Sequence, residues 1–113
     1  MIIINNDLEQ RYIKTDVFNS WIKELPNNVQ VKVWIYINRF LRGNNSNCKA
    51  VGEGVSEIKI NYQKGCRIYY TISKNRNPLL LAGSDKDGNQ KQQKETIQKA
   101  IYIKNYFKVR GLL

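Results

Sequence analysis

The chain has 113 residues and is 42% hydrophobic, which is enough for one folded core but not for two. It contains no histidine, so the commonest general base and the commonest zinc ligand are both excluded. Its two cysteines, Cys48 and Cys66, have neither a disulfide pattern nor metal-ligand spacing, and Cys66 stands where a small buried hydrophobe is expected. We therefore predict a single domain, residues 1–113, with no metal and no small-molecule cofactor.

Positive charge is concentrated in the C-terminal part of the chain. The formal net charge is +10, of which residues 1–48 carry +2 and residues 49–113 carry +8. This excess favours a polyanionic partner, either nucleic acid or an acidic protein segment, although a solvated lysine-rich surface would give the same composition. The initial apolar run, MIII, is too short for a signal peptide, and no segment approaches ~20 apolar residues. We expect a cytoplasmic protein without a membrane span.

The N-terminal part predicts a short strand followed by a helix. Residues 10–14 can form the strand, and Thr15 or Asp16 is a suitable N-cap for the helix. The apolar stripe of this helix, which Pro26 ends, consists of Val17, Phe18, Trp21, Ile22 and Leu25.

A second helix is predicted over residues 29–42. Asn27 and Asn28 are expected to form a turn that caps it, and Gly43 stands where a left-handed helix end would be. Two short helices joined by a tight turn indicate an antiparallel helical hairpin.

The C-terminal half predicts a strand pair, a third strand and a last helix. A polar connection rich in Gly and Asn, residues 43–55, leads into the strand pair at residues 54–72. A short buried strand is expected at residues 79–82, followed by a loop at 84–92 and a helix over about 92–108.

Alternation sorts the side chains of the strand pair onto two faces. The apolar face consists of Ile58, Ile60, Tyr62, Cys66, Ile68, Tyr70 and Ile72. The opposite face consists of Glu57, Lys59, Asn61, Arg67, Tyr69 and Thr71. An antiparallel register that keeps the apolar side together also gathers a carboxylate, two cations and a phenol. We predict that these groups point outward together and form a site for phosphate chemistry.

In order along the chain, these segments resemble the RelE/ParE superfamily of type II toxins, and in particular the phage-derived addiction module killer proteins near HigB. The matching residues are Phe18, Trp21-Ile22, Leu25, Arg39-Phe40-Leu41, Gly43-Asn44, Lys49–Ile60, Gly65–Tyr70, Leu79–Gly83, Asp85-Lys86, Ile97 and Ala100. The pairing of GVSEIKI with GCRIYY is the specific part, because its spacing and its identities both match.

The resemblance implies an α+β fold in which an N-terminal helical hairpin packs on a small antiparallel sheet of three to four strands, with a C-terminal helix alongside. It also implies a toxin that cleaves messenger RNA on the ribosome without a metal and that a cognate antitoxin holds in check. The expected partners are therefore the antitoxin, the ribosome and mRNA.

Cleavage of RNA by its own 2′-hydroxyl requires a base, cations that stabilise the charge at phosphorus, and an acid for the departing 5′ oxygen. Arg67 is the first candidate for stabilising that charge, because its planar donors fit two phosphate oxygens at once. Lys59 is a second clamp or the base, and Glu57 is the alternative base. Tyr69 can stack on a nucleobase or donate a proton.

Lys86 and Lys64 are the candidates for binding RNA phosphate. The simpler interpretation of Glu57, Lys59 and Arg67 is a ladder of ion pairs on a solvated sheet face, where each pair contributes less than ~1 kcal/mol. The alternative functions are a ParE-like inhibitor that binds gyrase without catalysis, and a basic RNA-binding module or degenerate toxin.

Overall fold

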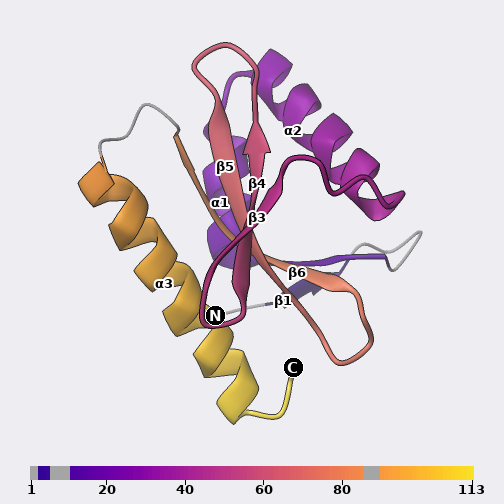
Figure 1. Ribbon diagram of the computed structural model, residues 1–113, viewed down its shortest axis with the longest axis vertical. Coiled ribbons are helices and arrows are strands. Elements are labelled where there is room, and N and C mark those ends of the chain that lie inside the picture. The colour runs from indigo at the N-terminus through magenta and orange to yellow at the C-terminus, as the bar shows by residue number, and fades with distance from the viewer. Residues whose placement is uncertain (1–2, 6–10, 86–89) are drawn as a thin grey trace.

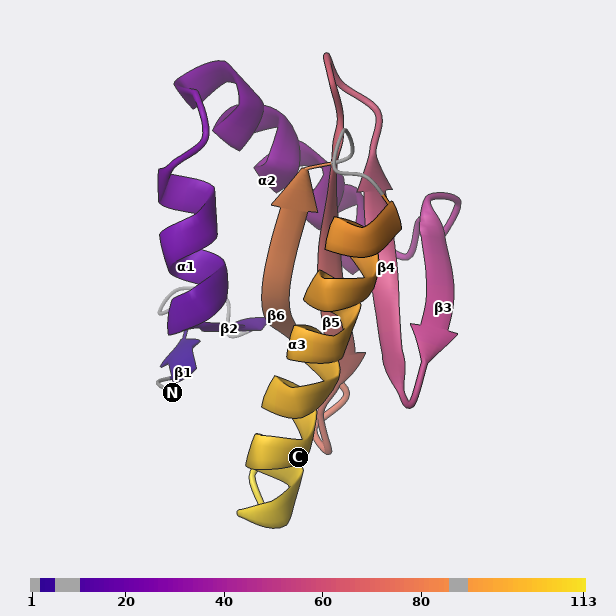
Figure 2. The ribbon, with the colours of Figure 1, turned by 90° about the vertical axis from the view of Figure 1, so that its left-hand side faces the viewer.

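The computed structural model describes residues 3–5, 11–85 and 90–113, and in them three helices and six strands form an α+β fold. In chain order the elements are β1 (Ile3–Asn5), β2 (Ile13–Thr15), α1 (Asp16–Lys23), α2 (Asn27–Leu41), β3 (Cys48–Gly52), β4 (Val55–Ile60), β5 (Cys66–Ile72), β6 (Pro78–Asp85) and α3 (Gln90–Val109). All strands belong to one sheet in the order β1-β2-β6-β5-β4-β3. The sheet separates α1 and α2 on one face from α3 on the other (Figures 1 and 2).

The start of α1 follows from a side-chain cap. The hydroxyl of Thr15 accepts a hydrogen bond from the backbone N–H of Phe18 at 3.0 Å, as one of the two predicted caps requires. The same hydroxyl donates to the carbonyl of Leu81 at 2.8 Å. One buried side chain therefore ends β2, begins α1 and fixes both to β6.

The second helix begins earlier than predicted, because Asn27 and Asn28 form its first turn rather than a turn before it. Pro26 precedes the first helical residue, and the side-chain amide of Asn28 donates to the hydroxyl of Tyr62 at 3.1 Å. Gly43 has a φ of 98°, as expected of the residue after a helix end.

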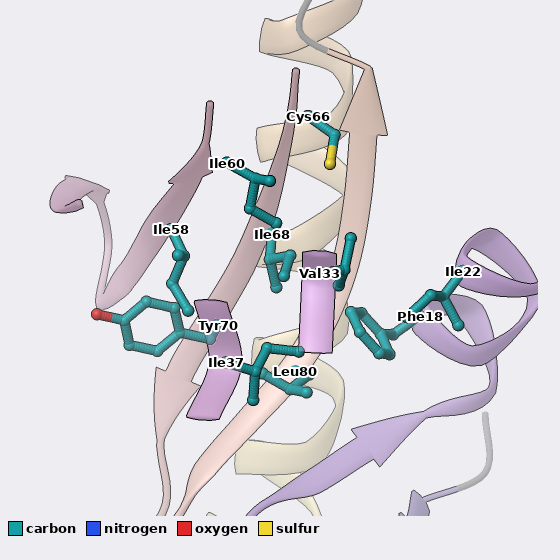
Figure 3. Packing of buried hydrophobic residues seen from close by; sticks show 10 residues of the cluster. All are labelled: Phe18, Ile22, Val33, Ile37, Ile58, Ile60, Cys66, Ile68, Tyr70 and Leu80. Carbon is teal, nitrogen blue, oxygen red and sulfur yellow. The ribbon is translucent and has the colours of Figure 1, made fainter. Parts of the chain in front are cut away.

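The predicted apolar face of the strand pair forms the core beneath α1 and α2 (Figure 3). In the β4–β5 pairing, Ile58 lies opposite Ile68 and Ile60 opposite Cys66. These side chains pack with Phe18, Ile22, Val33, Ile37, Tyr70 and Leu80. The prediction is wrong for Ile72, which is 52% exposed because it lies at the end of β5, beyond the cover of the helices.

The sheet is larger than the predicted three to four strands, and it is mixed rather than antiparallel. Strand β3 was expected to be a connection, yet it pairs with β4, with a register shift between Ala50 and Gly52. Strand β2 pairs in parallel with β6 at Leu79 and Leu80. The pairing of β2 with β6 joins segments far apart in the chain, so it depends on the tertiary fold and leaves no local pattern in the sequence. Strand β3 is adjacent to β4 in the chain but lacks a clear alternation that would mark it as a strand.

A second core lies between the sheet and α3. It consists of Val55, Tyr69, Leu79 and Leu81 from the sheet with Ala100, Ile101, Ile103 and Phe107 from α3. Leu79 and Leu81 are two residues apart in β6, so alternation brings both to this core. A register shift between Tyr69 and Tyr70 in the β5–β6 pairing leaves Leu81 without a partner in β5. Within the described residues, no helix is both long and apolar enough to cross a bilayer.

Candidate functional site

The β4–β5 pairing brings four of the predicted catalytic residues to neighbouring positions on one face of the sheet. Lys59 lies directly opposite Arg67, and Glu57 lies directly opposite Tyr69. The pairing is antiparallel, so residues directly across from each other point to the same side. The predicted gathering of two cations, a carboxylate and a phenol on one face is therefore present.

The predicted outward exposure of this face is wrong, because α3 lies over it. The ring of Tyr69 is fully buried, and Glu57 is only 6% exposed. Tyr69 is covered because Ala100, Ile103 and Phe107 of α3 bury their own apolar surface in the same core. The buried ring cannot stack on a nucleobase in this arrangement, so any contribution from Tyr69 has to come through its hydroxyl group.

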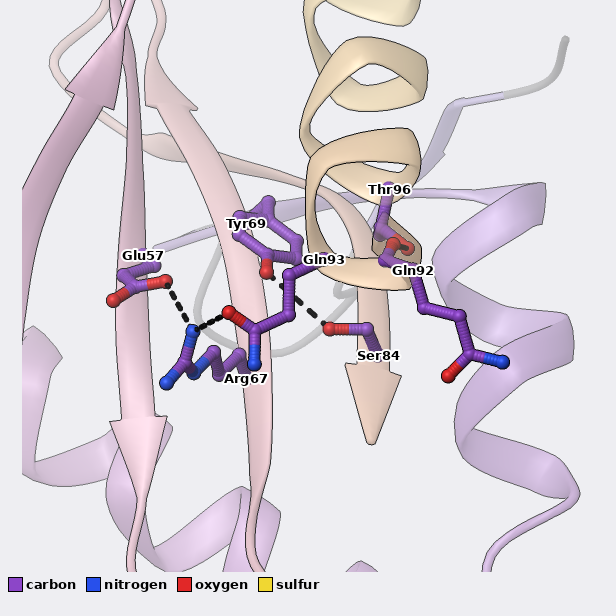
Figure 4. Close-up of polar contacts among 7 residues, drawn as sticks. All are labelled: Glu57, Arg67, Tyr69, Ser84, Gln92, Gln93 and Thr96. Carbon is purple, nitrogen blue, oxygen red and sulfur yellow. Dashed lines mark hydrogen bonds and ion pairs between the residues drawn. The ribbon is translucent and has the colours of Figure 1, made fainter. Parts of the chain in front are cut away.

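Arg67 lies beneath the first turns of α3 and is held by two side chains (Figure 4). Its Nη1 donates to Oε1 of Gln93 at 2.6 Å and lies 3.9 Å from Oε2 of Glu57. The side chain retains 18% exposure, whereas the Nε atom is buried and has no hydrogen-bond partner among the described residues. The guanidinium therefore keeps an unused donor and a weakly paired charge, which is uncommon for a half-buried arginine.

A pair of hydroxyl groups lies next to Arg67. Ser84 of β6 is directly opposite Arg67 of β5, and its Oγ is 3.3 Å from the hydroxyl of Tyr69. Figure 4 shows this pair on the side of Arg67 away from Glu57. Both groups can donate or accept, so they can relay a proton or bind a phosphate oxygen.

The site carries an excess of positive charge, which favours the binding of an anion. Lys59 and Arg67 face each other across the strands, and like charges in that position destabilise a sheet. Glu57 is the single carboxylate in ion-pair contact with Arg67 among the described residues, and at 3.9 Å that contact is long. A phosphate bound here would be attracted by the two cations and would complete the donor set of Arg67.

The two lysines predicted to bind RNA phosphate are not both placed at this site. Lys86 lies outside the described residues. Lys64 is exposed in the turn between β4 and β5, and it lines a cleft of about 370 Å³ that also contains Glu24, Cys66 and Asp85. That cleft includes residues of the α1–α2 turn, so Lys64 faces the helical-hairpin side of the molecule rather than Arg67.

Cys66 occupies the inward position that its place in the strand predicted. Burial raises the pKa of its thiol to about 11, and the nearby carboxylate of Asp85 acts in the same direction. The thiol therefore stays protonated near neutral pH and is a poor nucleophile.

Sequence reasoning missed Gln93 and Ser84 as neighbours of Arg67. Gln93 belongs to a run rich in Lys and Gln, QKQQKE, which is typical of a solvated helix surface. Ser84 was expected to begin a loop, whereas it is the second-last residue of β6. Only the packing of α3 across the sheet and the length of β6 place these two residues at the site.

Comparison with known proteins gives the chain its family. Residues 20–104 match the family described as phage-derived protein Gp49-like (DUF891), a span that includes the second half of α1, all of α2, strands β3 to β6 and most of α3. A protein of Haemophilus influenzae, described as uncharacterized, is 35% identical over 85 residues, which cover 74% of this chain and 86% of that protein. The chain therefore belongs to the Gp49-like family, which is associated with addiction-module toxins.

Proposed function

We propose that this protein is the toxin of a type II toxin–antitoxin system, a member of the RelE/ParE superfamily, and an endoribonuclease that cuts mRNA on the ribosome. The observation that carries the proposal is the state of Arg67: its Nε has no hydrogen-bond partner among the described residues, and its charge is only loosely paired with Glu57. A cation kept in this state, with Lys59 directly opposite, suits the extra negative charge of a phosphodiester under attack.

The proposed reaction transfers the phosphoryl group within the RNA. The 2′-oxygen attacks the adjacent phosphorus as its proton passes to a base, the bond from phosphorus to the 5′ oxygen breaks, and that oxygen takes up a proton. The products are a 2′,3′-cyclic phosphate and a 5′-hydroxyl. Arg67 and Lys59 stabilise the charge on the phosphorane oxygens, and Glu57 is the first candidate for the base, with Lys59 as the alternative.

The remaining predicted residues take supporting roles. The hydroxyl of Tyr69, through its contact with Ser84, is the candidate donor of a proton to the leaving oxygen. Lys86 and Lys64 are proposed to hold the flanking phosphates of the RNA.

The start of α3 governs access to Arg67. The Gln93 amide oxygen accepts from the guanidinium at 2.6 Å, and a phosphate oxygen can replace it as a stronger, charged acceptor. In the described part of α3, the buried residues are Ala100, Ile101, Ile103 and Phe107, all in its second half. The first turns can therefore move by a small amount without exposing that core.

The experiment is induced expression of the wild-type protein and of Arg67→Ala, with measurement of growth, of amino-acid incorporation and of DNA breaks. We expect the wild type to stop growth and translation while the DNA stays intact. Arg67→Ala should stop neither growth nor translation, and its circular dichroism spectrum should match that of the wild type. Full growth arrest by Arg67→Ala would contradict the nuclease. Growth arrest accompanied by DNA breaks would instead identify a gyrase inhibitor, and a wild type without any effect would identify a degenerate or purely RNA-binding module.

A further inference from the structure

A second positively charged site lies at the end of the sheet away from Arg67. A groove of about 310 Å³, which we call the basic groove, is lined by Gly54, Thr71, Ile72, Ser73, Lys74, Lys104, Lys108 and Leu113. Arg67 stands near the start of β5, whereas Ser73 directly follows its end. No Asp or Glu side chain of the described residues lines this groove, so its side-chain charge is entirely positive.

The three lysines of the basic groove come from two separate elements. Lys104 and Lys108 are four residues apart on α3, and like charges at that spacing destabilise a helix. Lys74 comes from the turn between β5 and β6. The helix dipole favours a cation at Lys108, near the C-terminal end of α3, but it does not explain Lys74. A bound anion would offset the repulsion among all three.

The groove is built around buried polar side chains. Thr71 is 7% exposed and donates its hydroxyl to the carbonyl of Gly54 at 2.8 Å, and the Nζ of Lys104 donates to the carbonyl of Glu53. These two bonds fix the β3–β4 turn beside the groove. Ser73 is 8% exposed, and its buried Oγ has no hydrogen-bond partner among the described residues. A buried hydroxyl without a partner is uncommon in folded proteins and calls for a ligand or water.

We propose that the basic groove binds a phosphate group of RNA, with the Lys74 and Lys108 ammonium groups supplying charge and the Ser73 hydroxyl a hydrogen bond. The inference rests on the proposed function, because it gives the RNA a second phosphate contact. The six residues from Arg67 to Ser73 in extended β5 correspond to ~20 Å, a distance within reach of one single strand bound along the protein. The groove thus sets the course of the RNA on one side of the cut.

The first test measures how RNA affinity depends on salt, with a 2′-O-methyl oligonucleotide that cannot be cut. The double variant Lys74→Ala/Lys108→Ala should give a log–log slope shallower by ~0.7 than the wild type, because the one phosphate contact of the groove is lost. Lys104 is left in place since it holds the β3–β4 turn. The matched control Lys23→Ala/Arg42→Ala removes two exposed charges at the ends of α1 and α2 and should leave the slope unchanged. Equal slopes for the two double variants would overturn the proposal.

The second test uses inorganic phosphate as the probe and Ser73→Ala as the variant, followed by NMR of the backbone amides. In the wild type, phosphate should shift the amides of residues 71–74 and of Gly54, and Ser73→Ala should weaken this binding about tenfold. Because the hydroxyl has no hydrogen-bond partner in the part of the chain that the structure describes, the variant should unfold at the same temperature as the wild type. Phosphate shifts without any effect of the lysine pair on RNA would show a free-anion site and would overturn the assignment to RNA.

These outcomes separate the groove from the reaction at Arg67. If the protein is not a nuclease, Arg67→Ala will still stop growth, growth arrest will come with DNA breaks, or the wild type will have no effect. Each of these results is independent of whether the groove binds phosphate. If the groove does not bind phosphate, growth arrest by the wild type and its loss in Arg67→Ala are unaffected.

Discussion

At the scale of single residues, Arg67 is the group on which the proposed chemistry depends. The described residues satisfy its guanidinium only in part: Nη1 makes one short bond to Gln93 and a long contact to Glu57, and Nε has no hydrogen-bond partner among them. The acceptor of its short bond is a neutral amide, which a phosphate oxygen can replace as a stronger, charged acceptor.

Replacing Arg67 with lysine tests whether the planar guanidinium matters beyond its charge. Lysine keeps the positive charge but loses the two parallel donors, so we expect RNA cleavage to slow by about ten- to a hundredfold, a loss of ~1.5–3 kcal/mol in transition-state stabilisation. The measurement is the cleavage rate on programmed ribosomes. A rate equal to that of the wild type would mean that Arg67 acts only as a point charge.

A second residue-scale prediction concerns Cys66, whose thiol has its pKa raised to about 11 by burial. The folded protein holds this proton more tightly than the unfolded chain, where the value is 9.0. The resulting stability is therefore fully present below pH 9 and is lost as the pH rises from 9 toward 11. Urea unfolding should show that the free energy of unfolding falls more between pH 8 and pH 10.5 for the wild type than for Cys66→Ala. Equal losses in the two proteins would contradict the raised pKa.

At the scale of elements, the N-terminus of α1 and the position of α3 decide the shape of the site. The cap of α1 was predictable because Thr15 precedes an apolar stripe of helical spacing, and that signal is local. The face covered by α3 was not predictable. Alternation assigns Glu57 and Arg67 to one side of the sheet and Ile58 and Ile68 to the other, but it does not say which side a distant helix will cover.

The same reasoning explains the other differences from the sequence predictions. Cys48–Gly52 contains a Cys, a Lys and a Gly without clear alternation, so only its pairing with β4 makes it a strand. Asn27 and Asn28 are favoured both in turns and near the starts of helices, so the sequence alone does not separate the two. In the structure Pro26 is the N-cap and α2 starts directly after it. The predicted catalytic residues were brought together correctly because hairpin pairing is nearly local, whereas Gln93 joined them through the long-range packing of α3.

The prediction at this scale concerns Thr15, which is fully buried and joins α1 to β6. Thr15→Ala removes the cap and leaves the Leu81 carbonyl without that donor, so we expect a loss of about 1–2 kcal/mol in unfolding free energy. Thr15→Ser keeps the hydroxyl and should recover most of the loss. The measurement is chemical denaturation of the three proteins, and a serine variant as unstable as the alanine variant would show that the methyl group, not the hydroxyl, matters.

At the scale of the whole molecule, two positively charged sites lie at opposite ends of β5. The Lys59–Arg67 pair lies at one end of β5, the basic groove lies at the other, and α3 extends from Gln93 beside Arg67 to Lys108 in the groove. The net charge of +8 in residues 49–113 predicted a polyanionic partner without saying where it would bind. Membership in the Gp49-like family agrees with a toxin, and the geometry around Arg67 suggests its chemistry.

The most direct measurement of that chemistry is a map of RNA 5′ ends in cells shortly after induction of the wild type or of Arg67→Ala. We predict new 5′-hydroxyl ends inside coding sequences of translated messages for the wild type, and none above background for Arg67→Ala at equal protein levels. Messages that stay intact while wild-type cells stop growing, or identical ends produced by both proteins, would contradict a ribonuclease centred on Arg67.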